Sequence, residues 1–146
     1  MLTYVNSVAF LRDEPLAVTL RNFDVPEDGF AWSLGKWCEI RFPFSNTLKR
    51  NVTTADLIFD LDVFKSAPAF NGQNVFVYLN GLRIGSHRIE GRITCINSFD
   101  PSILNPVENV LTFDTPEAAK PEDYGIMDNR VLAIQLFSLQ IRPAGR

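Results

Sequence analysis

The feature that most constrains the fold is a strict alternation of apolar and polar side chains in the segment 55–64. Leu57, Phe59, Leu61 and Val63 fall on one face of an extended chain, and the other face is mostly acidic. A period of two is typical of a β-strand with one buried face, whereas a helix groups every third or fourth residue. The segment therefore predicts a half-buried strand.

A tight hairpin is predicted around the dipeptide Asn80-Gly81. The runs on either side of it, 73–79 and 82–89, are rich in sheet-forming residues. Both central positions of a type I′ turn need a positive φ, which Asn and Gly adopt more readily than other residues. We expect the two runs to be adjacent antiparallel strands.

The last third of the chain predicts two more strands joined by a long loop. The run 109–113 is sheet-forming, the segment 114–130 is polar and interrupted by prolines, and 131–141 is an apolar strand. Shorter strand candidates occupy 3–11, 17–20, 37–42 and 92–96, and single helical turns are expected at 116–120 and 101–104. Many short strands with turn signals between them predict an all-β, jelly-roll-like sandwich of two antiparallel sheets with minimal helix.

Length and charge narrow the class of protein. At 146 residues, 46% of them hydrophobic, the chain is expected to form a single β-sandwich domain over 1–146. The formal net charge is -3 and the arginines are scattered, which argues against a nucleic-acid partner. The sequence has no apolar run long enough to span a membrane and no secretory signal pattern, so we expect a cytoplasmic protein or a domain of something larger.

The sequence holds few residues suited to catalysis. His87 is the only histidine, and no Gly-x-Ser-x-Gly motif supplies a nucleophile for it to activate. We therefore expect a protein that is not an enzyme, in which His87 is either an exposed strand residue or a ligand contact.

Metal ligands are equally sparse. Cys38 and Cys95 are widely separated and lie in strand-like runs, which favours two buried free thiols, with a disulfide as the alternative. One histidine and two separate cysteines do not make a transition-metal set. No cofactor is expected. A structural calcium among loop carboxylates stays open, but Asp60 and Asp62, which have a calcium-like spacing, are better explained as a solvated strand face.

Six residues are candidates for ligand binding. Trp32 and Trp37 lie close together in the chain and are either an aromatic platform or core residues. Strand alternation places Arg83 and His87 on one face and Arg88 on the other, unless a bulge intervenes. At the end of the long loop, Asp128 and Arg130 offer polar contacts or, alternatively, form an internal clasp. The candidate set is Trp32, Trp37, Arg83, His87, Asp128 and Arg130.

Four spaced motifs together resemble a known kind of domain. They are Trp32-Ser-x-x-Gly-x-Trp37, Gln73-x-Val-x-Val-x-x-Asn-Gly81, Asn109-x-Leu-x-Phe113 and Pro116…Pro121…Gly125-x-x-Asp-x-Arg130. Their order resembles the galactose-binding-like jelly-roll domains attached to bacterial glycosyltransferases and other surface-polysaccharide enzymes. The resemblance implies an accessory, carbohydrate-binding domain.

The function expected from the sequence is therefore non-catalytic binding of a polysaccharide or glycan. The alternative is a structural or assembly domain that docks a partner chain, a neighbouring glycosyltransferase domain or a second copy of itself. An exposed apolar patch would favour this alternative, and a polar groove with aromatic residues would favour glycan binding.

Overall fold

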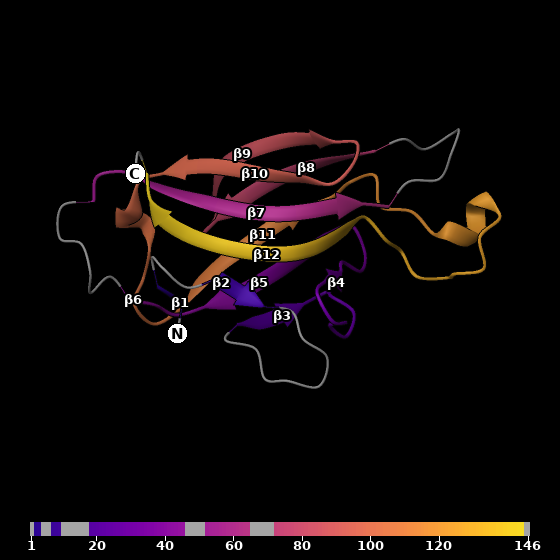
Figure 1. The fold of residues 1–146 in the computed structure, drawn as a ribbon, viewed down its shortest axis with the longest axis horizontal. Helices are drawn as coiled ribbons and strands as arrows, with labels where there is room; N and C mark the ends of the chain where they lie inside the picture. The colour runs from indigo at the N-terminus through magenta and orange to yellow at the C-terminus, as the bar shows by residue number, and fades with distance from the viewer. Residues whose placement is uncertain (1, 4–6, 10–17, 46–51, 65–71, 145–146) are drawn as a thin grey trace.

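The computed structural model describes residues 2–3, 7–9, 18–45, 52–64 and 72–144, and it is a sandwich of two antiparallel sheets (Figure 1). The β7 sheet has the order β10-β7-β12-β2, with β4 also paired to β12. The β11 sheet has the order β3-β5-β11-β8-β9. A short parallel pair, β1 (Leu2–Thr3) with β6 (Phe44–Ser45), lies outside both.

The strand bounds follow the predicted alternation closely. In the β7 sheet they are β2 Ser7–Ala9, β4 Ala31–Trp32, β7 Ala55–Val63, β10 Ile93–Phe99 and β12 Ile134–Pro143. In the β11 sheet they are β3 Thr19–Arg21, β5 Trp37–Phe42, β8 Gln73–Leu79, β9 Leu82–Ile89 and β11 Asn109–Asp114. The predicted all-β sandwich is confirmed. The predicted strand 3–11 is matched by β1 and β2, and the rest of that segment lies outside the described residues.

One hydrophobic core fills the space between the sheets. Strand β7 alternates buried and half-buried residues along its whole length, as a strand with one inward face requires. Its Phe59 is fully buried and meets Phe113 of β11 edge to face, with 5.2 Å between ring centroids. Such tilted aromatic pairs stabilise a core beyond the area they bury. This contact joins the two sheets near the middle of the sandwich.

The Asn80-Gly81 hairpin is confirmed by its backbone angles. Asn80 has φ 50° and Gly81 has φ 83°, as a type I′ turn needs. The Asn80 side chain also ties the turn to its neighbours, because its Oδ1 accepts from the amide of Val110 at 2.8 Å and its Nδ2 donates to the carbonyl of Ile103 at 2.7 Å. The residue therefore supports the hairpin both through its backbone and through its amide.

In the part of the chain that the structure describes, helix is confined to two short 3-10 turns, η1 (Pro101–Ile103) and η2 (Pro121–Tyr124). The first confirms the turn predicted at 101–104. The turn predicted at 116–120 is confirmed only at its start, where the amide of Ala118 donates to the carbonyl of Thr115, because Ala119 exchanges two backbone hydrogen bonds with Leu132 and is extended. A helical turn, η2, begins only at Pro121, in the loop that projects beyond the end of the sandwich (Figure 1).

Both cysteines are free and buried, which confirms the favoured prediction. Burial raises the pKa of the Cys95 thiol to about 11 and raises that of Cys38 further, so neither sulfur ionises near neutral pH. Among the described residues, no helix is both long and apolar enough to cross a bilayer.

Candidate ligand-binding face

The outward face of the β11 sheet carries a row of side chains that crosses four strands. Residues directly opposite one another in an antiparallel pair project to the same side of the sheet. The buried neighbours on β5, β8 and β11 point into the core, so the residues between them point outward. Following the register from strand to strand gives a first row of Trp37, Asp114, Phe76 and Ser86.

A second row lies beside the first, two residues along on β5, β11 and β8 and three residues along on β9. The same register gives it the members Arg21, Glu39, Thr112, Tyr78 and Arg83. We call the two rows together the aromatic face, after Trp37, Phe76 and Tyr78. Three ring side chains on one sheet face, with polar groups between them, make a surface that is both apolar and able to form hydrogen bonds.

A carboxylate stands at the centre of the first row. Asp114 on β11 is directly opposite Trp37 on one side and Phe76 on the other. Neighbouring strands lie about 4.8 Å apart, so the backbones of Trp37 and Phe76 are separated by roughly 10 Å with that of Asp114 between them. Within the described ranges, the Asp114 side chain has no hydrogen-bond or ion-pair partner. Its oxygens are therefore acceptors that a ligand can use.

Two arginines cover the rings at the ends of this surface. The guanidinium carbon of Arg21 lies 5.4 Å from the centroid of the Trp37 ring, and that of Arg83 lies 4.6 Å from the centroid of Phe76. Both distances fall within the range of cation–π attraction. Trp37 still exposes 38% of its surface, so its ring remains accessible.

A β-bulge decides which residues of β9 reach the aromatic face. Val77 is opposite Gly85, but the next residue, Tyr78, is opposite Arg83, so Ile84 is an extra residue on β9. The extra residue brings Arg83 to the same side as Arg88 and sends His87 to the other. The prediction that Arg83 and His87 share a face, with Arg88 opposite, is therefore wrong. The cause is a bulge in β9, the exception that the prediction allowed for.

His87 points inward, toward the edge of the other sheet. Its Nε2 is 2.9 Å from Oδ1 of Asn97 on β10, and its ring meets Phe59 edge to face at 5.7 Å. Asn97 is itself buried and packs against Gly85, where an added Cβ would lie 1.9 Å from its Nδ2. The chain's only histidine thus joins the edges of the two sheets and does not line the aromatic face.

The two tryptophans lie on opposite sides of the molecule. Trp32 on β4 is opposite Gln135 of β12, and its neighbour Ala31 is fully buried opposite Leu136. Trp32 is therefore a half-buried residue on the outward face of the β7 sheet. The expectation that Trp32 and Trp37 form one platform is corrected, because the chain crosses from one sheet to the other between them.

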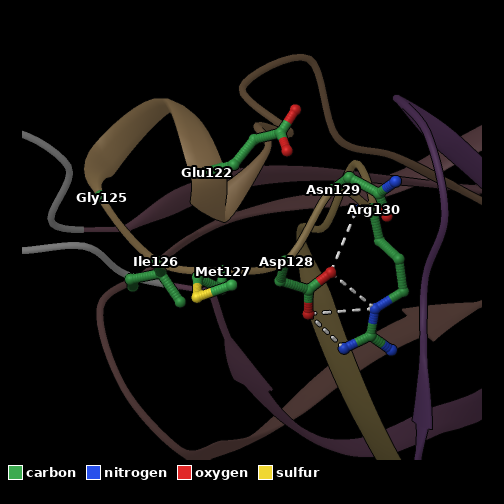
Figure 2. A pocket seen from close by; sticks show the side chains of 7 residues that line it. All are labelled: Glu122, Gly125, Ile126, Met127, Asp128, Asn129 and Arg130. Carbon is green, nitrogen blue, oxygen red and sulfur yellow. Dashed lines mark hydrogen bonds and ion pairs between the residues drawn. The ribbon is translucent and has the colours of Figure 1, made fainter.

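Asp128 and Arg130 form the internal clasp, one of the two alternatives drawn from the sequence (Figure 2). Arg130 donates from Nε and Nη2 to the carboxylate of Asp128, at 3.0 and 2.6 Å for the shortest contacts. Its Nη1 donates to Asp24 at 2.9 Å, across 106 residues of sequence. One guanidinium therefore ties the 115–133 loop to the segment before β4.

An open pocket of about 650 Å³ lies in the same loop. Figure 2 shows the clasped pair on one side of it and the side chains of Ile126 and Met127 on the other. The lining residues are Glu122, Gly125, Ile126, Met127, Asp128, Asn129 and Arg130. Because Asp128 and Arg130 are engaged with each other and with Asp24, the clasp positions the loop.

The clasp predicts a pH-dependent stability. Hydrogen bonds from Arg130 lower the pKa of Asp128 from 3.8 to about 2 and also lower the pKa of Asp24. A carboxyl with a lowered folded-state pKa contributes stability that is complete above about pH 4 and is lost as pH falls through about 2. We expect Asp128→Asn to be less stable than the wild type at pH 6, and the difference to vanish near pH 2.

Urea unfolding of both proteins at pH 6, 4 and 2 measures this difference. Glu122→Gln, in the same loop but outside the clasp, is the matched control and should differ little from the wild type at pH 6. A stability gap for Asp128→Asn that stayed constant across the three pH values would contradict the electrostatic origin of the clasp.

Known structures share the architecture. The CBM22-1 xylan-binding domain from Paenibacillus barcinonensis Xyn10C matches with a TM-score of 0.59 at 10% identity, over 94% of this chain and 92% of that one. A family 35 carbohydrate binding module from Clostridium thermocellum matches with a TM-score of 0.50 at 12% identity, over 96% of this chain and 100% of that one. The fold is a jelly roll.

The same jelly roll also matches part of a much larger protein. A family GH115 4-O-methyl-alpha-glucuronidase, BtGH115A, gives a TM-score of 0.54 at 9% identity, over 97% of this chain and 18% of that chain. No protein-family model matches the sequence. A search of curated proteins likewise finds no match. At these identities the likeness is one of fold.

Of the aromatic face, sequence reasoning named Trp37 and Arg83 and missed the other members, among them Phe76, Tyr78, Asp114 and Arg21. A usable signal was present in the run Val75-Phe76-Val77-Tyr78, where the positions between the inward valines carry aromatic rings. A strand that is apolar on both faces is either buried on both sides or presents one face to a ligand. Asp114 follows only from the strand register, which the sequence does not display.

Proposed function

We propose that this chain is a non-catalytic carbohydrate-binding domain and that the aromatic face is its binding surface. The observation that carries the proposal is the first row of the face, where Trp37 and Phe76 flank Asp114. Sugar rings have apolar C–H faces and a rim of hydroxyls. Aromatic rings can pack on the former, and a carboxylate accepts strong hydrogen bonds from the latter.

The shared jelly-roll fold supports this proposal. The matched structures include a xylan-binding domain and a family 35 carbohydrate binding module. The match to a segment of BtGH115A supports a further part of it, that the domain serves as an accessory unit beside a polysaccharide-active enzyme. Binding in place of catalysis is supported by His87, whose ring is engaged with Asn97 and Phe59 inside the sandwich.

The test is a glycan array followed by calorimetric titration of the best glycan, with and without calcium. We expect the wild type to bind, Trp37→Ala to bind roughly thirtyfold more weakly, as expected for loss of a central aromatic contact, and Trp32→Ala to bind like the wild type. Trp32→Ala is the matched control, because it removes the other tryptophan from the opposite face. Failure of the wild type to bind any glycan, in either buffer, would overturn the proposal.

A second candidate function, docking of a partner, has one observation in its favour. Ile126 and Met127, near the end of the projecting loop, expose 48% and 103% of their surfaces. Solvent-facing apolar side chains on a projecting loop are suited to contact with another chain. Sedimentation at increasing concentration tests self-association: a mass that rises in the wild type and stays monomeric in Met127→Lys would favour this function.

A further inference from the structure

Three arginines of the described chain stack on aromatic rings, and they differ in one respect. Arg92 lies 3.7 Å from the centroid of Phe137 on the β7 sheet and also donates to Asp60 at 2.9 Å. Arg21 and Arg83, on the aromatic face, have no carboxylate partner among the residues that the structure places. The stacked arginine on one side of the molecule is thus ion-paired, and the two on the other side are not.

The remaining arginines of the β11 sheet surface are neutralised by neighbours. Arg41 pairs with Glu39 at 3.2 Å and with Glu108 at 3.4 Å, and Arg88 pairs with Glu117 at 3.2 Å. Of the four charged side chains on the aromatic face, Glu39 is already paired with Arg41, whereas Arg21, Arg83 and Asp114 have no ion-pair partner among the described residues. The formal charges of the face balance, but its two unpaired arginines stand on the two edge strands of the sheet.

Stacking gives each guanidinium a defined place and leaves its N–H groups for another partner. A guanidinium resting on a ring keeps its donors in its own plane, and their fork matches the two oxygens of a carboxylate. The ring also restricts the side chain before the ligand arrives, which lowers the ordering cost of binding. Arg21 and Arg83 are therefore built to accept an anionic group from solvent.

The order of charges across the face limits where that anionic group can bind. Arg21 is on β3 and Arg83 on β9, at opposite edges of a five-stranded sheet, so their backbones are about 19 Å apart at a strand spacing of 4.8 Å, and each guanidinium reaches inward over the ring on the next strand. Asp114 lies on the middle strand, where it repels a carboxylate and accepts from hydroxyls. A ligand that satisfies all three has hydroxyls at its centre and negative charge toward its ends.

We propose that the glycan bound by this domain is an acidic oligosaccharide built from uronic acids. It lies across the strands, with sugar rings on Trp37 and Phe76 and carboxylates at Arg21 and Arg83. The inference rests on the proposed function and adds the chemical class of the ligand. It also implies that a chain of several sugars is needed, since one ring cannot reach both arginines.

The probes that test it are oligomers of galacturonic, glucuronic and mannuronic acid. Each is compared with its own carboxyl-reduced form, in which every carboxylate has become a neutral hydroxymethyl group. We expect at least one acid oligomer to bind more than tenfold tighter than its reduced form. This preference should shrink as sodium chloride is raised from 50 to 500 mM, because salt screens exposed charges.

Two variants test whether the arginine charge on the aromatic face, and not a stacked arginine elsewhere, recognises the acidic groups. Arg83→Gln should lower the affinity for the acid oligomer by about tenfold more than it lowers that for the reduced form. Arg92→Gln, a stacked arginine on the opposite face, should change neither affinity. Circular dichroism before titration verifies that each variant is folded.

The outcomes distinguish a failure of the acidic specificity from a failure of carbohydrate binding itself. Equal affinity for acid and reduced oligomers, or binding of neutral glycans alone, would overturn the acidic specificity and leave carbohydrate binding intact. Equal losses from Arg83→Gln and Arg92→Gln would overturn the assignment of the charge to the aromatic face. Absence of binding to all acid, reduced and array glycans would overturn both proposals together.

Discussion

The double variant Trp37→Ala/Phe76→Ala is expected to bind its glycan roughly 700-fold more weakly than the wild type. Each ring is a central aromatic contact whose loss costs about 2 kcal/mol, and every 1.4 kcal/mol is about a tenfold change in affinity. The rings lie on β5 and β8, whose backbones are roughly 10 Å apart with β11 between them. At that separation the two losses should add with little coupling.

Titration calorimetry on the wild type, the two single variants and the double variant measures this. Tyr78, a half-buried ring in the second row, offers a graded comparison, since Tyr78→Ala should cost less than either first-row change. A double variant no weaker than the worse single variant would mean that the glycan uses only one of the two rings. The ligand would then not lie across the strands.

Phe59→Ala is expected to remove about 4 kcal/mol of unfolding free energy. Phe59 is fully buried on β7 and contacts both Phe113 of β11 and His87 of β9. Truncating a buried phenylalanine loses its transfer free energy and leaves a cavity that the neighbours fill only in part. Here the cavity opens between the two sheets.

Chemical and thermal unfolding measure the effect, with a drop in melting temperature of roughly 10 °C for a chain of this size. Phe76→Ala is the matched control, because the same change on the outward face of β8 opens no cavity in the core. A loss below about 1.5 kcal/mol for Phe59→Ala would contradict the role given to this contact between the sheets.

The alternation of side chains was sufficient to predict most strands and their buried faces. Segments 55–63 and 73–79 keep the period of two from end to end, and the structure buries the residues that the pattern selected. The Asn80-Gly81 turn was predictable because the needed φ angles restrict the residue types. These features are local, so the sequence displays them directly.

The candidate site was less predictable because it depends on register and on bulges. One extra residue in β9 exchanges the sides on which Arg83 and His87 lie; Gly85 beside it is compatible with a bulge but does not say where the register shifts. A similar irregularity lies in β12, where the pairing with β7 shifts between Leu136 and Ser138. Such shifts arise from the match between two strands, which no single segment contains.

Closeness in the chain was likewise a poor guide to closeness in space. Trp32 and Trp37 are five residues apart but belong to different sheets, whereas Trp37, Asp114 and Phe76 come from three separate strands of one sheet. Asp128 and Arg130 were predictable as a pair, since two residues of separation suit a carboxylate and a guanidinium. Their third partner, Asp24, required the fold.

The inward histidine has a practical consequence. Because the chain has one histidine, its imidazole carbon-bound protons give a single, unambiguous set of signals in a proton magnetic resonance spectrum. The signals of the His87 ring are sensitive to the contact between β9 and β10, because the ring is hydrogen-bonded to Asn97. His87 belongs to the same strand as Arg83. The molecule therefore carries a native spectroscopic label, which reports whether the edge of the sandwich shifts when a ligand is bound on its outer surface.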